Sequence, residues 1–285
     1  MKYKTLNQSL KTAFLIIKLV IPFYLAADVL IYLGILQKIS FIFTPFTAVL
    51  GLSPEVSLSI AAGVLFNLYA AIAFAAPLGL TPYEWTILGL FLGIAHALPV
   101  ENTIMKKLSI PHWYSTVLRL FVGILAVLFV RMLPIHIEGK SIQKEITLPH
   151  YDSFMQMLLN SLQNATVLSL KIIVLITLII FLMAIIKEKL FKNKNLNTSF
   201  SILTGIILGI TYGAGILIEE KNKLTKKELL FVGTFLMIAH SLIEDPLLFI
   251  IFGANFWILV IVRLFFAVVI SYLVLFYAKR FNLFS

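Results

Sequence analysis

The sequence predicts an all-α polytopic integral membrane protein built from two inverted-topology repeats. Of its 285 residues, 60% are hydrophobic and 13% are charged, whereas a soluble domain carries about 25% charged residues. The second half repeats the first at an offset of 144 residues, with 14 identities over the 42 positions of 80–121. Two equivalent segments, 84–110 and 228–252, are interrupted by polar residues, as in transporters with inverted repeats.

Apolar stretches of about 20 residues are long enough to cross a bilayer as helices. The candidate spans cover residues 12–37, 54–78, 113–133, 165–186, 200–218 and 255–278. The first of them follows a basic start and exceeds the roughly 7 to 15 apolar residues of a signal peptide. We therefore expect it to be a retained transmembrane helix.

Lysine and arginine residues suggest the orientation, because they concentrate in cytoplasmic segments. They crowd the N-terminus, the 187–194 loop and the C-terminus. If 84–110 and 228–252 each crossed once, the last two of these segments would lie on opposite sides. We therefore expect two re-entrant hairpins and a protein of the inner (cytoplasmic) membrane, with both termini cytoplasmic. This topology leaves the lysines of 221–227 outside, against the same rule.

The repeats divide the chain into three parts. Residues 1–134 and 165–285 each form a repeat of three transmembrane helices and one re-entrant helical hairpin. Residues 135–164 link them as an extracytoplasmic loop, in which 151–162 is expected to form an interfacial amphipathic helix. Each hairpin begins with a capping box, Thr81 to Glu84 in one half and Thr225 to Glu228 in the other.

The hairpin tips carry the residues that we expect to form a site near the bilayer midplane. Irregular backbone at membrane depth requires cover by protein or by a water-filled cavity, so paired tips indicate an enclosed polar site. The tip residues are His96, Glu101, His240, Glu244 and Asp245. Imidazole and carboxylate suit a divalent first-row metal ion, with His96, Glu101, His240 and Asp245 as ligands. The same groups suit proton-coupled transport, or the histidines only tie the turns.

Two arginines, Arg119 and Arg263, occupy equivalent places in the following spans. A buried charge is costly unless it is paired, so each arginine is expected to neutralise the carboxylate of its own half, Glu101 or Asp245. Alternatively, the two guanidinium groups bind an anion such as a phosphate or a carboxylate.

Further polar residues lie in the apolar stretches. Asn67 and Thr211 are related by the 144-residue offset, with Tyr69 and Tyr212 beside them. These residues either line a polar path or hydrogen-bond neighbouring helices. Asp28 is a candidate for cation or proton handling, with an ion pair to Lys18 as the structural alternative.

Composition excludes several functions. The absence of cysteine rules out disulfides and thiolate metal sites. The net charge of +10 follows the topology, and without a basic soluble domain we expect no nucleic-acid partner. The sequence has no Ser-His-Asp order, no phosphate-binding glycine loop and no HExxH motif, so we do not expect an enzyme. No cofactor is expected, since a divalent ion would be the substrate.

The stretch Ala239-His-Ser-Leu-Ile-Glu-Asp-Pro-Leu-Leu-Phe249, with Gly253-Ala-Asn and Arg263-Leu-Phe after it, resembles the nucleoside-recognition (Gate) domain membrane proteins. That superfamily includes spore maturation proteins and the membrane part of FeoB-type ferrous-iron transporters. The resemblance spans about 200–275 and, more weakly, 60–130, and it implies two Gate units. The FeoB relation favours a metal, although this chain has neither the G domain nor a cysteine.

The sequence thus predicts a membrane transporter for a divalent metal cation, or a proton-coupled one, with a site formed by both hairpin tips. One alternative is transport of a nucleoside-like or anionic solute, or of a lipid phosphate headgroup, bound by the paired arginines. Another is a non-transporting membrane scaffold. The expected partners are the lipid bilayer, a small solute or ion, and a second copy of the chain in a homodimer.

Overall fold

The computed structural model describes residues 2–134, 148–191, 198–219 and 224–280, and all regular structure in these ranges is helical. The all-α prediction is therefore confirmed. The first half contains α1 (Lys2–Tyr32), α2 (Ile35–Ser40), η1 (Phe41–Phe43), α3 (Thr44–Leu50), η2 (Pro54–Val56), α4 (Ser57–Leu65), α5 (Leu68–Ala75), η3 (Ala76–Leu78), α6 (Pro82–Ala95), α7 (Leu98–Lys107) and α8 (His112–Met132). The second half contains α9 (Phe154–Phe191), α10 (Thr198–Leu208), α11 (Ile210–Glu219), α12 (Lys226–Ile238), α13 (Glu244–Ile250) and α14 (Phe256–Arg280).

The chain is a multi-pass membrane protein. Within the described residues, five helical segments are long and apolar enough to cross a bilayer, and a sixth is added if the strongly bent run from Ile35 to Leu65 is one span. The five are Thr5–Tyr32, Pro82–Lys107, His112–Met132, Phe154–Lys189 and Phe256–Arg280. Large apolar side chains such as Phe14, Val174 and Phe276 are more than half exposed on these helices. Lipid tails are the medium that tolerates such a surface.

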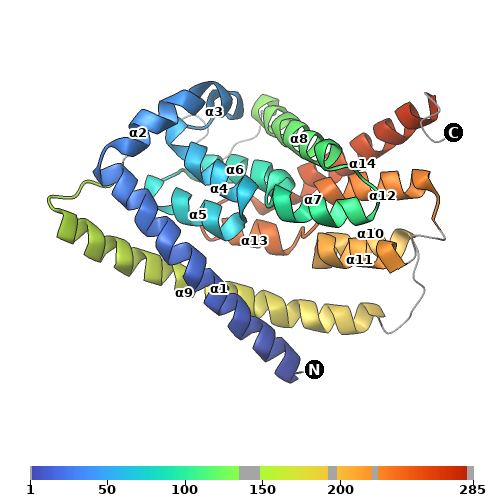
Figure 1. Ribbon diagram of the computed structural model, residues 1–285, viewed down its shortest axis with the longest axis horizontal. Helices are drawn as coiled ribbons and strands as arrows, with labels where there is room; N and C mark the ends of the chain where they lie inside the picture. The colour runs from blue at the N-terminus through green and yellow to red at the C-terminus, as the bar shows by residue number, and fades with distance from the viewer. Residues whose placement is uncertain (1, 135–147, 192–197, 220–223, 281–285) are drawn as a thin grey trace.

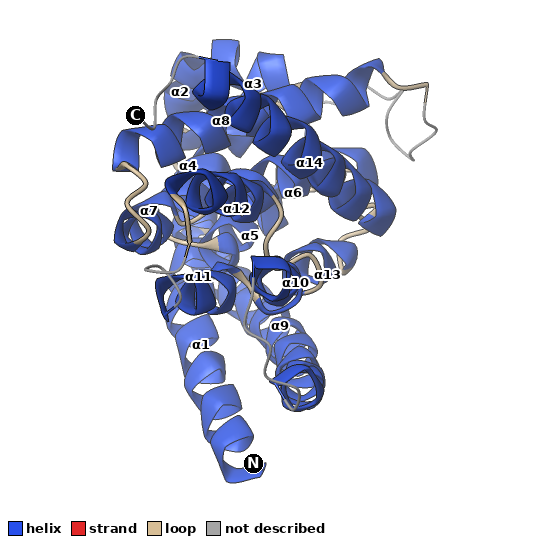
Figure 2. Cartoon of the chain, turned by 90° about the vertical axis from the view of Figure 1, so that its right-hand side faces the viewer, coloured by secondary structure: helices blue, strands red, loops and turns tan. Residues whose placement is uncertain are grey.

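The helices lie in layers (Figures 1 and 2). Helices α8 and α14 lie at one side of the molecule, and α1 and α9 cross each other at the opposite side. Between them, α6 packs on α8 and α12 packs on α14, while α4–α5 and α10–α11 fill the space towards α1 and α9. The candidate site residues are therefore carried in the middle layers.

Helices α4 and α5 fold back on each other as a hairpin, and so do α10 and α11. The Ser59 hydroxyl donates to the carbonyl of Ala71 at 2.7 Å, and the Ser201 hydroxyl donates to that of Gly213 at 2.6 Å. These bonds relate the two hairpins by an offset of 142 residues, two fewer than the offset between 80–121 and its repeat. The segments 54–78 and 200–218 are thus hairpins, and their prediction as straight spans is wrong.

The re-entrant hairpin predicted at 84–110 is also wrong. Helices α6 and α7 continue each other as one interrupted segment of 26 residues, long enough to cross outright. Helices α12 and α13 likewise do not pack side by side as the arms of a hairpin would. The polar interruptions that indicated a turn instead mark the breaks between α6 and α7 and between α12 and α13.

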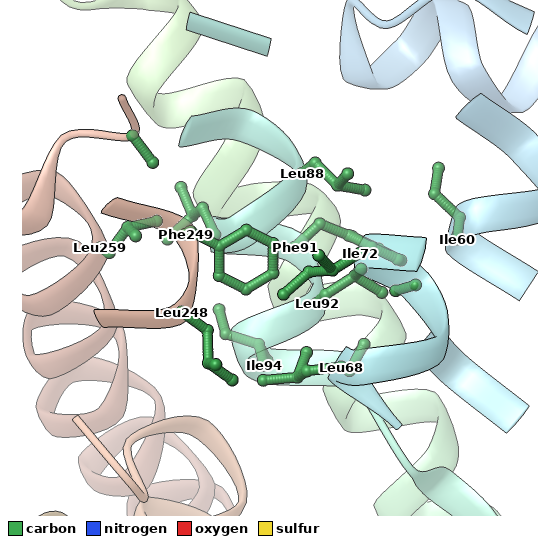
Figure 3. Close-up of a cluster of buried hydrophobic side chains, with 14 of the residues drawn as sticks. Ile60, Leu68, Ile72, Leu88, Phe91, Leu92, Ile94, Leu248, Phe249 and Leu259 are labelled. Carbon is green, nitrogen blue, oxygen red and sulfur yellow. The ribbon is translucent and has the colours of Figure 1, made fainter. Parts of the chain in front are cut away.

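The two broken helices pass each other in opposite directions and meet at their breaks. Contacts between the halves show the antiparallel order, because later residues of the first half contact earlier residues of the second. The contacting pairs are Thr86 with Asn255, Gly89 with Phe249, His96 with His240, and Ile110 with Gly233. Figure 3 shows Phe91 of the first half and Phe249 of the second among the buried side chains of one apolar cluster. An antiparallel crossing of this kind is what inverted repeats produce when both helices span a membrane.

The α4–α5 and α10–α11 hairpins thus occupy equivalent places in the two halves. Lys226 and Lys227 stand at the start of α12, and if α12 and α13 together cross the membrane, these lysines lie on the same side as the C-terminal end of α9, in keeping with the positive-inside rule. The equivalent tryptophans Trp113 and Trp257 are 69% and 67% exposed at the starts of α8 and α14. In inverted repeats they lie at opposite membrane interfaces, where tryptophan is enriched.

The segment between the repeats also differs from the prediction. Residues 151–162 form no separate interfacial helix, because α9 begins at Phe154 and runs without a break to Phe191. The part of the linker at 135–147 lies outside the described residues. In the first repeat, the short helices α2 and α3 were not expected, and Phe41 and Ile42 between them are 70% and 65% exposed.

The topology is tested by the side on which Lys227 lies. Because the chain has no cysteine, single cysteines at Lys227, Lys106 and Asp152 can be labelled with a membrane-impermeant maleimide in intact cells. We expect Lys227→Cys to be protected like Lys106→Cys, while Asp152→Cys reacts. Labelling of Lys227→Cys from outside would restore the topology with hairpins at 84–110 and 228–252.

Candidate functional site

The helix breaks are held open by the neighbouring hairpins. Ala97 and Ser241 occupy equivalent positions with φ values of 47° and 48°, a left-handed conformation that is uncommon for residues other than glycine. The Ala97 amide donates to the carbonyl of Gly63 at 2.9 Å, and the Ser241 amide donates to that of Gly205 at 3.1 Å. These bonds stabilise backbone that the broken helices leave unpaired.

Gly63 and Gly205 allow this approach because they have no side chain. A Cβ on Gly63 would lie 2.6 Å from a Leu92 methyl carbon, and one on Gly205 would lie 2.2 Å from the equivalent carbon of Leu236. Sequence reasoning missed these glycines. They align only at the 142-residue offset, so an alignment that allowed a two-residue gap would have found them.

Arg119 binds the end of α6 and the start of α7 together. Its Nε donates to the carbonyl of Ile94 at 2.6 Å, and its Nη2 donates to that of His96 at 2.9 Å. Its Nη1 lies 2.6 Å from Oε2 of Glu101. The guanidinium is fully buried, and it satisfies carbonyls that a broken helix leaves without partners.

Arg263 repeats this arrangement in the second half. Its Nε and Nη2 donate to the carbonyls of Ile238 and His240 at 3.1 and 2.6 Å, and its Nη1 donates to Asp245 at 3.3 Å. Every guanidinium nitrogen of both arginines thus faces an acceptor of its own half. This geometry matches the expected pairing, in which the arginines neutralise Glu101 and Asp245.

The two histidines are held in one tautomer. Nδ1 of His96 lies 2.8 Å from the carbonyl of Leu92, and Nδ1 of His240 lies 2.8 Å from that of Leu236. A carbonyl oxygen only accepts, so each Nδ1 carries the proton, and in the neutral ring Nε2 keeps its lone pair. The rings lie 5.3 Å apart, centroid to centroid, and both Nε2 atoms face the space between the halves.

Glu101 and Asp245 complete a four-residue cluster with the histidines. Oε1 of Glu101 lies 3.2 Å from Nε2 of His96 and 3.3 Å from Nε2 of His240. Nε2 of His240 is buried and has no hydrogen-bond partner. One ligand atom each from His96, His240 and Asp245 lies within 4.8 Å of the others. The structure therefore brings together the four residues that the sequence predicted as metal ligands.

Glu244 lies beside this cluster, next to Asp245 at the start of α13. Its side chain hydrogen-bonds the Tyr69 hydroxyl of α5, so the tyrosine joins the two halves. The equivalent of Glu244 in the first half is Val100, which is 59% exposed. The cluster is thus nearly symmetric, whereas its surroundings are not.

A cavity of about 680 Å³ leads to Glu244. It is lined by the N-terminal part of α1, the C-terminal half of α9 and the turn between α10 and α11, with Gln8, Lys187, Glu188 and Tyr212 among its polar residues. Lys187 lies over the Tyr212 ring, 4.3 Å from its centroid. The cavity therefore connects the lysine-rich end of α9 with the acidic side of α13.

The remaining predicted residues lie outside the cluster. Asn67 caps α5 by accepting from the amide of Ala70 at 3.0 Å, and at the 142-residue offset its equivalent is Gly209 rather than Thr211. Thr211 is exposed, so the structure does not place it in the site. Tyr212 lines the cavity, and Tyr69 contacts Glu244.

Comparison with known proteins supports the membrane assignment. The chain is 29% identical over 281 residues to the uncharacterized membrane protein YvoD of Bacillus subtilis (strain 168), covering 89% of this chain and 87% of YvoD. No protein-family profile matches the chain, and no solved structure matches it. The resemblance to Gate-domain proteins therefore stays a prediction.

The role of the arginines is tested by replacing Arg119 with Leu. Because this change leaves Glu101 buried and unpaired, we expect a loss of about 3 to 5 kcal/mol in the free energy of unfolding. Adding Glu101→Gln should restore only part of this loss, since the carbonyls of Ile94 and His96 remain without a donor. Denaturant titration in detergent measures both effects.

Full rescue by Glu101→Gln would show that Arg119 acts only as a counter-charge. Arg119→Lys provides the matched control, because it keeps the charge but not the planar fork. A stable Arg119→Leu protein would remove the arginine from the architecture altogether.

Proposed function

We propose that this protein transports a divalent first-row metal ion, such as Mn²⁺, Fe²⁺ or Zn²⁺, through the cluster of His96, His240, Glu101 and Asp245. The observation that carries the proposal is the orientation of the two imidazoles. Each donates its Nδ1 proton to a backbone carbonyl and turns Nε2 towards the other. Metal-binding histidines are typically oriented by such a bond.

The spacing of the cluster supports the same ligand. A four-coordinate ion with bonds of about 2.1 Å separates its ligand atoms by roughly 3.4 Å. Oε1 of Glu101 lies 3.2 and 3.3 Å from the two Nε2 atoms, and Asp245 falls within the 4.8 Å group. Small movements of the Asp245 side chain complete the coordination.

The arginines adjust the strength of binding. Two guanidinium groups balance the two carboxylates of the cluster, so the ion is held mainly by neutral imidazoles and by carboxylates whose charge is partly compensated. A site of this kind binds less tightly than an uncompensated acidic cage. Moderate affinity suits a carrier, because its substrate must also leave.

The cavity next to Glu244 supplies a route to one side of the membrane. With the N-terminus and the start of the 187–194 loop cytoplasmic, the cavity opens to the cytoplasm, and Glu244, the neighbour of Asp245 in the chain, lies in its lining. A carboxylate at this position attracts a hydrated cation. The geometry thus favours a conformation with access from the inside.

Binding of an anion by the arginines is the weaker candidate, because every guanidinium nitrogen faces an acceptor within its own half. The resemblance to the membrane part of FeoB-type transporters also favours a metal. A non-transporting scaffold predicts that the cluster tolerates substitution without loss of any bound ion.

Metal binding is tested by calorimetry with Mn²⁺ on the purified protein. We expect one site per chain, lost in His96→Ala and in His240→Ala, because both imidazoles face the same ion. Affinity should fall as pH drops through about 6.5, where an ordinary imidazole takes up a proton and loses its lone pair. His112→Ala, which changes an exposed histidine, serves as the control.

Unchanged binding in the His96→Ala, His240→Ala double variant would overturn the proposal. Absence of binding in the parent protein with each of Mn²⁺, Fe²⁺ and Zn²⁺ would do so too, and would leave the histidines as structural residues of the helix breaks.

The access route is tested by filling the cavity. Ala184 lines it on α9, and Ala184→Trp should reduce metal uptake into proteoliposomes at least tenfold while binding of Mn²⁺ in detergent persists. Ala184→Ser is the matched control. Uptake at the parental rate in Ala184→Trp would exclude this cavity from the route.

A further inference from the structure

Asp28 is a buried carboxyl group outside the metal cluster. It lies one turn before the end of α1, has no exposed surface, and faces α9. Helices α1 and α9 form the most extensive helix pair of the described chain. The carboxyl is therefore enclosed in the contact between α1 and α9, at the end of the molecule where α9 begins.

The partners of Asp28 are hydroxyl groups. Its Oδ2 is hydrogen-bonded to the Ser161 hydroxyl of α9, and the Tyr151 hydroxyl is a second partner. Tyr24, one turn earlier on α1, lies beside it and hydrogen-bonds Asn164 of α9. The other oxygen, Oδ1, is buried with no hydrogen-bond partner.

No cation compensates this carboxyl group among the described residues. None of the ion pairs there includes Asp28, and the titratable or hydroxyl groups beside it from α1, α9 and the 148–153 segment are Tyr24, Ser161 and Tyr151. α2, η3 and α5 also pack on α1, and no residue of these elements forms an ion pair with Asp28. Lys18 is exposed and lies ten residues away on the same helix, about 15 Å along its axis.

An ionised carboxylate without a counter-charge costs several kcal/mol when it is buried, and it becomes neutral by taking up a proton. The surroundings suit the neutral acid. A protonated Oδ2 donates to the Ser161 oxygen, whose own proton then points to the sulfur of Met157, 3.8 Å away. Burial raises the pKa of Tyr151, so its hydroxyl stays protonated and can donate to Asp28.

We propose that Asp28 is a proton-binding site closed between α1 and α9, and that the proton it takes up from the extracytoplasmic side is the coupling ion of transport. The role as coupling ion rests on the proposed function, whereas the binding of the proton does not. Proton uptake neutralises the carboxylate and allows the α1–α9 contact to close. Opening of this contact exposes the acid to water, where it ionises and releases the proton.

The placement of the site gives the proton a direction. Tyr151 and the start of α9 lie at the extracytoplasmic end in the proposed topology, whereas the cavity beside Glu244 opens at the other end of the same helix pair. Because only the closed contact favours the protonated acid, low extracytoplasmic pH favours the state seen here, with its cavity open to the cytoplasm.

Infrared difference spectroscopy on the purified protein tests proton binding directly. At neutral pH, the parent protein minus Asp28→Asn should show the carbonyl stretch of one protonated carboxylic acid. Asp152→Asn, which alters an exposed aspartate, should leave this band in place. Absence of a band that depends on Asp28 would overturn the proposal, because the carboxyl would then be ionised.

Spin-label distances test the coupling to closure. Cysteines at Leu33 and Leu159, both more than half exposed near the outer ends of α1 and α9, give a distance that should lengthen as pH rises. Asp28→Asn, which mimics the neutral acid, should keep the short distance at every pH. A distance that follows Na⁺ concentration at fixed pH would assign the site to that cation and overturn the proton.

Two further measurements guard against ambiguity. If Asp28→Asn does not fold, Ser161→Ala provides the second variant. It removes one hydrogen bond to Asp28 and should shift the frequency of the acid band, whereas the control Ser169→Ala should not. An unshifted band in Ser161→Ala overturns the assignment.

Mn²⁺ binding should persist in Asp28→Asn. If the parent protein binds no metal ion, the proposed function fails, and the infrared band alone decides whether Asp28 binds a proton.

Discussion

The architecture depends on two buried guanidinium groups that each tie a broken helix together. A helix interrupted inside a membrane exposes carbonyls that lipid cannot satisfy. Arg119 and Arg263 supply these carbonyls with donors, and the same side chains neutralise Glu101 and Asp245. One residue per half thus makes both the irregular backbone and the buried acid tolerable, and the histidines of the breaks gain fixed positions as a consequence.

The hairpins complete what the arginines begin. They approach the breaks closely enough to accept backbone hydrogen bonds only because Gly63 and Gly205 carry no side chain. The polar cluster at the centre therefore depends on two glycines in the neighbouring layer. The cluster can lie in the interior of an otherwise apolar molecule because its charged groups are paired within each half and the irregular backbone at the breaks is hydrogen-bonded by the neighbouring hairpins.

The helical class, the duplication and the cluster residues could be predicted from the sequence, because ionisable groups are rare in membrane-spanning segments and usually face the interior of the helix bundle. The position of the hairpins could not. A polar interruption has the same sequence pattern whether the chain turns back or continues. Which of the two occurs depends on tertiary contacts such as those of Ala97 and Ser241. Thr211 was misplaced for a related reason, since a gap-free offset of 144 hides the two-residue difference in the hairpins.

The length of α9 has a mechanical consequence. Its 38 residues extend about 57 Å, nearly twice the roughly 30 Å thickness of a hydrocarbon core. Ser161 meets Asp28 near the outer end, and Phe191 lies about 45 Å further along the helix. A rotation of about 5° at Ser161 would displace Phe191 by about 4 Å. In the proposed mechanism, the binding of one proton at Asp28 would thereby widen or narrow the cavity at the opposite end of α9.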